Sequence, residues 1–301
     1  MSERKTTTKF KINDLPSLIV DTYKAWDEAN PFRLSAVVAY YAVLSLPALL
    51  IIIINIIGSI WGPEIVQGKL THEISSALGR DAAEAIGTII SETQNKEKNL
   101  ISSIIGVGTL LFGATGVFYQ LKISLNEIWR IKPDPNVKFW KLVTDRARSF
   151  AFILVIGFLL LISFIITAGI STLNDYIHRV LPDFLIYVAY FLDFILSTGI
   201  ITVLFALMFR YLPDIKIKWK TVWKGAFITA ILFVIGKSLL GYYFGEANPG
   251  STYGAAGTIV LILLWVSYSC LILFFGAEFT YIYSKRYGII VEPSEIATKE
   301  K

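Results

Sequence analysis

Cysteine and histidine are scarce in this chain of 301 residues. The single cysteine, Cys270, excludes an intrachain disulfide and any metal site built from several thiolates. The two histidines, His72 and His178, are far apart in the sequence and leave little material for a metal centre. We therefore expect no metal, no cofactor and no enzymatic activity, and we expect Cys270 to be a small buried apolar residue.

Charged side chains are also scarce. Asp, Glu, Lys and Arg make up 17% of the residues, the apolar and aromatic set makes up 54%, and the mean hydropathy is +0.60. A soluble globular protein usually has about 25% charged and about 45–50% apolar residues. The composition excludes a disordered chain, a collagen and a disulfide-stabilised scaffold, and it indicates a membrane protein.

Six long apolar runs follow one another along the chain. They cover residues 34–60, 100–118, 149–171, 184–209, 225–244 and 253–283. Each is near or above the roughly 20 residues that a membrane-spanning helix needs. The first run starts too late and is too long to be a signal peptide. We therefore predict an all-α polytopic membrane protein with six transmembrane helices in residues 34–283, and with segments 1–33 and 284–301 outside the membrane.

Most of the 28 lysines and arginines fall in alternate segments, namely 1–33, 119–148, 210–224 and 284–301. The positive-inside rule therefore predicts that these segments and both termini are cytoplasmic, in a bacterial inner membrane. This distribution explains the basic pI without a nucleic-acid partner. The expected partners at this face are anionic lipid headgroups. Five tryptophans near the predicted interfaces suggest an aromatic belt: Trp61, Trp129, Trp140, Trp219 and Trp223.

Two segments outside the predicted spans have helical periodicity. The first has an apolar face of Leu15, Leu18, Ile19, Thr22 and Trp26, starts at Pro16 and is ended by Asn30-Pro31. It is expected either to lie in the inner interface or to pack under the helix bundle. The second is the first outer loop, residues 61–99, whose face of Ile74, Leu78, Ala82, Ala85, Ile86 and Ile89 predicts helices that cover the bundle mouth, a second copy or lipid.

Several strings resemble the YihY/BrkB family of bacterial inner-membrane proteins. They are Tyr40-Tyr41-Ala42-Val43-Leu44-Ser45-Leu46-Pro47, Leu125-Asn126-Glu127-Ile128-Trp129-Arg130, Tyr253-Gly254-Ala255-Ala256-Gly257, Leu264-Trp265 and Gly276-Ala277-Glu278. The resemblance extends from about Trp26 to about Tyr283 and implies six helices with both ends inside. Some family members carry an old ribonuclease BN label. We reject this activity because the chain lacks clustered His and Asp ligands for a metal.

Three ionisable residues fall within predicted spans and are candidates for a substrate or ion pathway, because charge at membrane depth is costly. Asp193 and Lys237 are predicted to pair in the outer half, either as a pair that opens when a substrate or proton binds or as a permanent lock between helices. Glu278 is either a proton acceptor in a transport cycle or is tied to an inner arginine, Arg130 or Arg210, or to the Asn126 region.

Pro47 lies in the middle of the first span and frees a backbone carbonyl near Val43. Tyr40, Tyr41 and Ser45 offer hydroxyls nearby. Interrupted helices line substrate cavities in transporters, which makes these residues further pathway candidates. The alternative is that small residues and kinks in these spans only allow close helix packing.

The leading functional hypothesis is therefore passage of a lipid-like or small amphiphilic substrate through a polar-lined cavity between the helices. One alternative is a structural or assembly protein of the envelope that binds a partner through its outer-loop helices. Another is a membrane enzyme acting on lipid, which requires converging catalytic groups at one interface.

Overall fold

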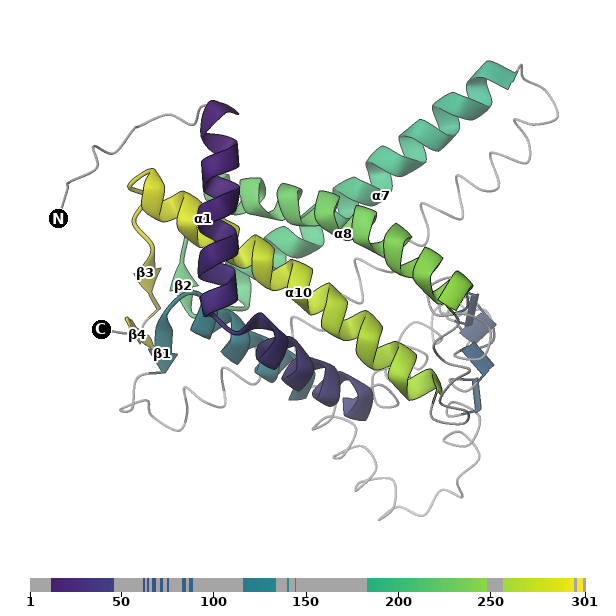
Figure 1. Ribbon diagram of the computed structural model, residues 1–301, viewed down its shortest axis with the longest axis horizontal. Helices are drawn as coiled ribbons and strands as arrows, with labels where there is room; N and C mark the ends of the chain where they lie inside the picture. The colour runs from purple at the N-terminus through teal and green to yellow at the C-terminus, as the bar shows by residue number, and fades with distance from the viewer. Residues whose placement is uncertain are drawn as a thin grey trace, which may run out of the picture.

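The computed structural model describes residues 12–45, 116–133, 183–247, 257–294 and 297–299, with single positions between 62 and 88 and at 140 and 144. Three long helices dominate this part (Figure 1): α7 (Asp183–Tyr211), α8 (Trp219–Ala247) and α10 (Gly257–Arg286). All three are long and apolar enough to cross a membrane. They correspond to the predicted spans 184–209, 225–244 and 253–283, although α8 begins earlier and α10 later than predicted.

Of the other three predicted spans, the first two are described only in part. A helix covers Pro31–Ser45, the start of the first span, and another covers residues 116–128, at the end of the second. Pro47, the rest of these two spans and the whole third span lie outside the described residues. Of the first outer loop, positions 64, 67, 68, 71, 72, 75, 83, 84, 87 and 88 are helical, in keeping with the helices predicted there. The apolar residues of the predicted face lie outside the described positions.

The amphipathic N-terminal helix is confirmed as α1 (Leu15–Glu28), which has proline in its first turn and follows a short 3-10 turn, η1 (Ile12–Asp14). α1 crosses α10 and packs against it (Figure 1), with Leu18 and Thr22 fully buried. Ile19 and Tyr23 stay exposed, so the helix packs against the bundle on one side and leaves a second apolar face open. After Glu28 the chain turns at Asn30, whose φ of 53° is left-handed.

The all-α prediction missed four short strands. β1 (Ile131–Pro133) pairs antiparallel with β4 (Ala297–Lys299), and β2 (Ile215–Lys216) pairs antiparallel with β3 (Glu292–Pro293). Residues 287–294 and 297–299 thus fold back on the helices, and their strands pair with the segment after the helix 116–128 and with the turn between α7 and α8. Strands of two or three residues are too short to show a periodicity in the sequence.

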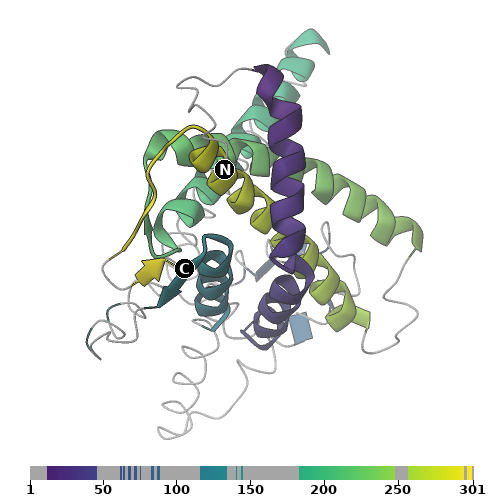
Figure 2. The ribbon, with the colours of Figure 1, turned by 60° about the vertical axis from the view of Figure 1, so that its left-hand side comes forward.

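These two pairings, together with the packing of α1 against α10, bring the described parts of four basic segments to one end of the molecule, seen from another side in Figure 2. We call this end, formed by α1, residues 129–133, the α7–α8 turn (212–218), the end of α10 and residues 287–299, the basic end. In both views α7 and α8 are close together near it and diverge toward their other ends. The described parts of the segments that charge distribution placed on one side of a membrane therefore lie together in space.

α8 and α10 are joined by a reciprocal contact of small residues. The Thr229 hydroxyl donates to the Gly225 carbonyl, and the Thr280 hydroxyl donates to the Gly276 carbonyl, each at 2.7 Å within its own helix. A methyl group on Gly225 would lie 1.7 Å from Thr280 Oγ1, and one on Gly276 would lie 1.7 Å from Thr229 Oγ1. Each threonine therefore fills the space left by the glycine of the other helix, which lets the two backbones approach closely.

Candidate functional site: two buried charge clusters

The helix 116–128 and the turn after it supply one side of each cluster. Lys122 and Asn126 are one helical turn apart and therefore share a face, and Arg130 follows directly after the helix. Arg130 has a left-handed φ of 54°, which ends the helix and directs the chain into β1. Apart from Ile123 and Glu127, the residues from 121 to 129 are buried.

The first cluster joins this helix to the α7–α8 turn. Lys122 Nζ lies 3.0 Å from Asp214 Oδ1, and both side chains are nearly buried, with 7% and 12% exposed. The Asn126 amide donates to Asp214 Oδ2 and accepts from the Asp214 backbone N–H, both at 2.8 Å. The Asp214 carbonyl in turn accepts from the Ser294 backbone N–H at 2.8 Å. One aspartate thus fixes the turn to the helix and to the folded-back C-terminal segment.

The second cluster joins the same helix to α10. Arg130 Nη1 lies 2.8 and 2.7 Å from the two carboxylate oxygens of Glu278. The Glu278 side chain is fully buried, whereas the Arg130 side chain is 32% exposed. The guanidinium also lies over the Tyr281 ring, 4.8 Å from its centre, and donates to the Ile128 carbonyl. The carboxylate is therefore enclosed by protein, and its cationic partner reaches toward solvent.

The stability of the Arg130–Glu278 pair depends strongly on the presence of both residues. A buried ion pair gains little over well-packed apolar residues, but removal of one partner leaves an uncompensated charge that costs about 3–5 kcal/mol. Protonation of the carboxylate or an anion that competes for the arginine would have a similar effect on the link between helices. Among the described residues, no group of His, Cys, Asp and Glu is arranged to hold a metal ion.

The predicted tie of Glu278 to an arginine is confirmed, with Arg130 as the partner. Asn126 does not contact Glu278 and instead holds Asp214. Arg210 donates to the Ile217 carbonyl, which closes the α7–α8 turn. Whether Glu278 also accepts protons in a transport cycle stays a prediction.

Asp193 and Lys237 lie on the two antiparallel helices α7 and α8. Phe205 and Phe233 are level with each other there, with ring centres 5.6 Å apart. Lys237 is four residues beyond Phe233, whereas Asp193 is twelve residues from Phe205. Asp193 and Lys237 are therefore offset by about 12 Å along the helix axes, at about 1.5 Å per residue. Lys237 is exposed, and the Asp193 side chain lies outside the described residues. Their pairing stays a prediction.

The hydroxyl-bearing candidates of the first span are not gathered at one place. Tyr40 and Tyr41 are exposed, and their rings contact each other at 5.5 Å. Ser45 is buried and donates to the Ala42 carbonyl of its own helix at 3.1 Å. Their role in a pathway, together with that of Pro47, stays a prediction.

Two members of the clusters, Lys122 and Asp214, were not predicted from the sequence. The spacing of Lys122 four residues before Asn126 was the available signal for a shared helix face. The aromatic-belt prediction was wrong for Trp129, which is 2% exposed and packs edge-on against Tyr281 at 5.7 Å. Cys270 is buried, as predicted.

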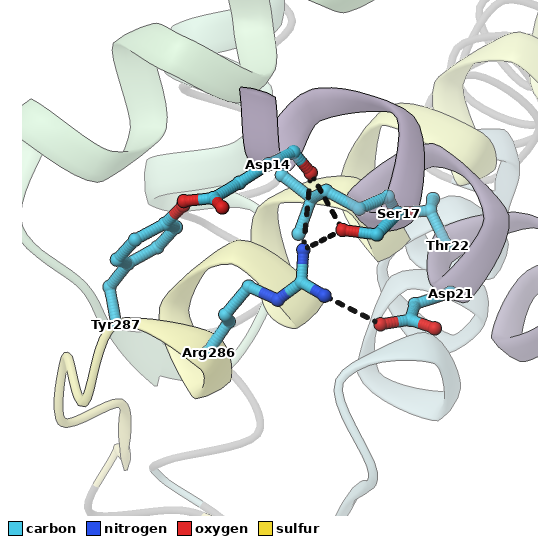
Figure 3. A network of polar contacts seen from close by, with 7 residues as sticks. Asp14, Ser17, Asp21, Thr22, Arg286 and Tyr287 are labelled. Atoms are coloured by element: carbon cyan, nitrogen blue, oxygen red, sulfur yellow. Dashed lines mark hydrogen bonds and ion pairs between the residues drawn. The ribbon is translucent and has the colours of Figure 1, made fainter. Parts of the chain in front are cut away.

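A third polar network holds α1 to the end of α10 (Figure 3). The Arg286 guanidinium donates to the Asp14 carbonyl at 3.2 Å, to Ser17 Oγ at 2.9 Å and to Asp21 Oδ2 at 3.1 Å. The Tyr287 hydroxyl donates to Asp14 Oδ2 at 2.9 Å. Burial, followed by the hydrogen bond to the Asp14 carboxylate, raises the pKa of Tyr287 above its usual value. The neutral phenol is thus the form that holds the N-terminal segment.

Long apolar helices with charges buried between them define a helical integral membrane protein. The chain belongs to the BrkB family, because the family model described as Virulence factor BrkB matches residues 22–299. Three similar curated proteins are described as UPF0761 membrane proteins. One from Alteromonas mediterranea is 24% identical over 80% of this chain and 79% of its own, and one from Mannheimia succiniciproducens is 23% identical over 89% and 90%. One from Idiomarina loihiensis is 27% identical over 70% and 72%. No solved structure matches the chain.

Proposed function

We propose that this protein is a transporter of the bacterial inner membrane that moves a lipid-like or small amphiphilic substrate between its helices. In this proposal it has six transmembrane helices and both termini in the cytoplasm, it is not an enzyme, and the basic end faces the cytoplasm. The positive-inside rule supports this orientation, because the lysine- and arginine-rich segments gather at that end.

The observation that carries the proposal is the Arg130–Glu278 pair. Ionisable residues at the edge of a membrane bundle are costly, and a permanent link between helices is made as well by apolar packing. A pair with one fully buried partner and one partly exposed partner is suited to opening, because an anionic group that arrives from the exposed side meets the arginine first. Once an anionic group has bound Arg130, the Glu278 carboxylate must be protonated or α10 must move to a second position.

The arrangement of the helices agrees with this mechanism. The two charge clusters close the bundle at the basic end, where they join the helix 116–128, α10 and the α7–α8 turn. α7 and α8 diverge away from that end (Figure 1). We therefore assign to the clusters the role of a gate at the cytoplasmic side, which is closed in the conformation described and opens during transport.

Reconstitution into vesicles tests the proposal. The protein is incorporated into phosphatidylcholine vesicles with traces of headgroup-labelled phosphatidylglycerol or phosphatidylcholine, and transfer between leaflets is measured by quenching of the outer label. Glu278→Gln keeps the shape of the side chain but removes its charge. Glu127→Gln is the matched control, because Glu127 forms an exposed ion pair with Arg33 at the same end.

We expect the wild type to transfer at least one probe faster than empty vesicles. Glu278→Gln should change the rate about tenfold or more, the factor that corresponds to about 1.4 kcal/mol, and Glu127→Gln should stay within about twofold. Wild-type rates equal to those of empty vesicles would contradict transport of these lipids and favour the envelope-assembly alternative. An unchanged rate in Glu278→Gln would exclude the pair from the gate.

A further inference from the structure

One side of α8 carries an exposed apolar stripe that shows where the membrane surface lies. It consists of side chains at helical spacing: Trp223, Phe227, Ile231, Ile235, Leu239 and Tyr242. Trp223 and Tyr242 are nineteen residues apart, or about 28 Å at about 1.5 Å per residue, close to the hydrocarbon thickness of about 30 Å. Tryptophan and tyrosine prefer the two membrane interfaces, so the stripe places Trp223 at one hydrocarbon boundary.

Beyond this boundary, toward the basic end, three aromatic rings form a ladder. The rings of Trp219 and Trp223 have centres 6.2 Å apart, and Tyr211, at the end of α7, meets Trp219 edge-on at 5.9 Å. All three are exposed, with 60% of Tyr211, 38% of Trp219 and 43% of Trp223 accessible. The ladder therefore lies in the headgroup layer and is open to lipid.

Lysines border the ladder because of the backbone geometry of the α7–α8 turn. Ile215 and Ile217 are buried, whereas Lys216 and Lys218 are exposed, the alternation expected of an extended segment. Lys220 is exposed in the first turn of α8 and lies three residues before Trp223, on the same side of the helix. Two aromatic rings are thus flanked by ammonium groups at the level of lipid phosphates.

Two further lysines near the ladder face anionic or aromatic groups of the protein. Lys216 lies opposite Glu292 in the β2–β3 pair. Lys224 donates to the Tyr283 hydroxyl and lies over that ring, 4.5 Å from its centre. Lys218 and Lys220, in contrast, are exposed and lie outside the β2–β3 pair, so no carboxylate faces them there.

We infer that Tyr211, Trp219, Trp223, Lys218 and Lys220 form a binding site for one anionic phospholipid of the surrounding bilayer. The two lysines bind its phosphate and headgroup, the rings pack along the glycerol region, and the acyl chains lie on the α8 stripe. This lipid is a resident partner and is separate from the substrate that the Arg130–Glu278 gate would admit. The site depends on membrane insertion and not on the proposed transport.

A lipid-binding measurement on the full chain tests the site. Immobilised protein in maltoside micelles is titrated with radiolabelled phosphatidylglycerol or phosphatidylcholine, and bound lipid is counted. The test variants are Lys218→Gln/Lys220→Gln and Trp219→Leu/Trp223→Leu. The matched control, Lys24→Gln/Lys285→Gln, removes the same charge from exposed residues of α1 and α10, which are not part of the ladder. Heat-induced exposure of Cys270 to a thiol dye verifies that each variant is folded.

We expect saturable binding of phosphatidylglycerol that exceeds binding of phosphatidylcholine. Removal of the two lysines should weaken it by about fivefold for each lysine, and the control pair should change it by less than about twofold. The tryptophan variant should weaken binding of both lipids. Equal binding of the two lipids, equal losses in the test and control variants, or displacement of the lipid by millimolar inorganic phosphate would each overturn the assignment. Loss of transport with lipid binding intact would contradict only the proposed function.

Discussion

The contact between α8 and α10 makes a quantitative prediction about Gly225. In Gly225→Ala the new methyl group would lie 1.7 Å from Thr280 Oγ1, 2.9 Å from Thr280 Cβ and 3.4 Å from the Gly276 carbonyl oxygen. Thr280 is fully buried and its hydroxyl is bound to Gly276, so a rotation of its side chain breaks that hydrogen bond. Either α8 and α10 must separate, or the hydrogen bond from the Thr280 hydroxyl to the Gly276 carbonyl must break.

The expected cost follows from these distances. Overpacking of a tight core costs about 1–3 kcal/mol, and loss of the buried hydrogen bond adds about 1 kcal/mol. We therefore expect a decrease of about 2–4 kcal/mol in stability, or roughly 5–10 °C in the thermal midpoint. Adding Thr280→Ala removes the clashing hydroxyl, so the double variant should be less destabilised than the sum of the single variants.

The single cysteine makes the measurement direct. Cys270 is buried and is the only cysteine, so its reaction with a thiol dye during heating reports the opening of α10. Gly241→Ala on the same helix is the control, because in the described part of the chain no atom outside the backbone of α8 lies within 4 Å of a methyl group there. It should be neutral or stabilised by up to about 1 kcal/mol, since alanine favours the helix. If Gly225→Ala melted at the same temperature as Gly241→Ala, the packing argument would be refuted.

Three further predictions concern the polar contacts at the basic end. Arg130→Gln should destabilise the protein more than Glu278→Gln, because Glu278 is fully buried and Arg130 is 32% exposed, and a double-mutant cycle by thiol-dye melting should give non-additive costs. Ser294→Pro removes the backbone N–H that donates to the α7–α8 turn and should lower the melting temperature. Ser294→Ala removes a buried hydroxyl that has no partner in the described part of the chain, and it should leave the melting temperature unchanged. Tyr287→Phe should lower the midpoint measured by circular dichroism near neutral pH, because the neutral phenol binds Asp14. The pKa of this phenol is raised above 10.0 in the folded protein, so its stabilisation is complete below pH 10 and is lost as the pH rises through the folded-state value. The gap between wild type and Tyr287→Phe should therefore close in that range, and a constant gap would refute the assignment.

The sequence predicted those features that depend on composition and on charge distribution. Residues 184–209 predict a long helix because Asp193 is their only charged residue, and Glu278 requires a cationic partner because it falls in a similar run. Arg130 was a predicted partner of Glu278 because the charge distribution put it at the side where the span of Glu278 ends. The polar residues that meet in space were therefore partly accessible from the linear order of charges.

Contacts that depend on the register of distant segments were not accessible in this way. Asp214 meets Lys122 and Asn126 only because the α7–α8 turn is folded against the helix 116–128, and nothing local in the turn encodes that docking. The β1–β4 and β2–β3 pairs involve so few residues that alternation gives no signal. The contact of Gly225 and Thr229 of α8 with α10 was not predicted, because small residues in a span do not indicate which helix they meet.

The cytoplasmic orientation of the basic end is the claim on which the proposed gate depends, and cysteine labelling measures it directly. In a Cys270→Ala background, Lys218→Cys and Lys285→Cys are treated with a membrane-impermeant maleimide in intact bacteria and again after permeabilisation. Both residues are exposed in the structure, so access by the reagent depends on the membrane alone. We expect labelling only after permeabilisation. Labelling of either residue in intact cells would contradict the cytoplasmic orientation of the basic end.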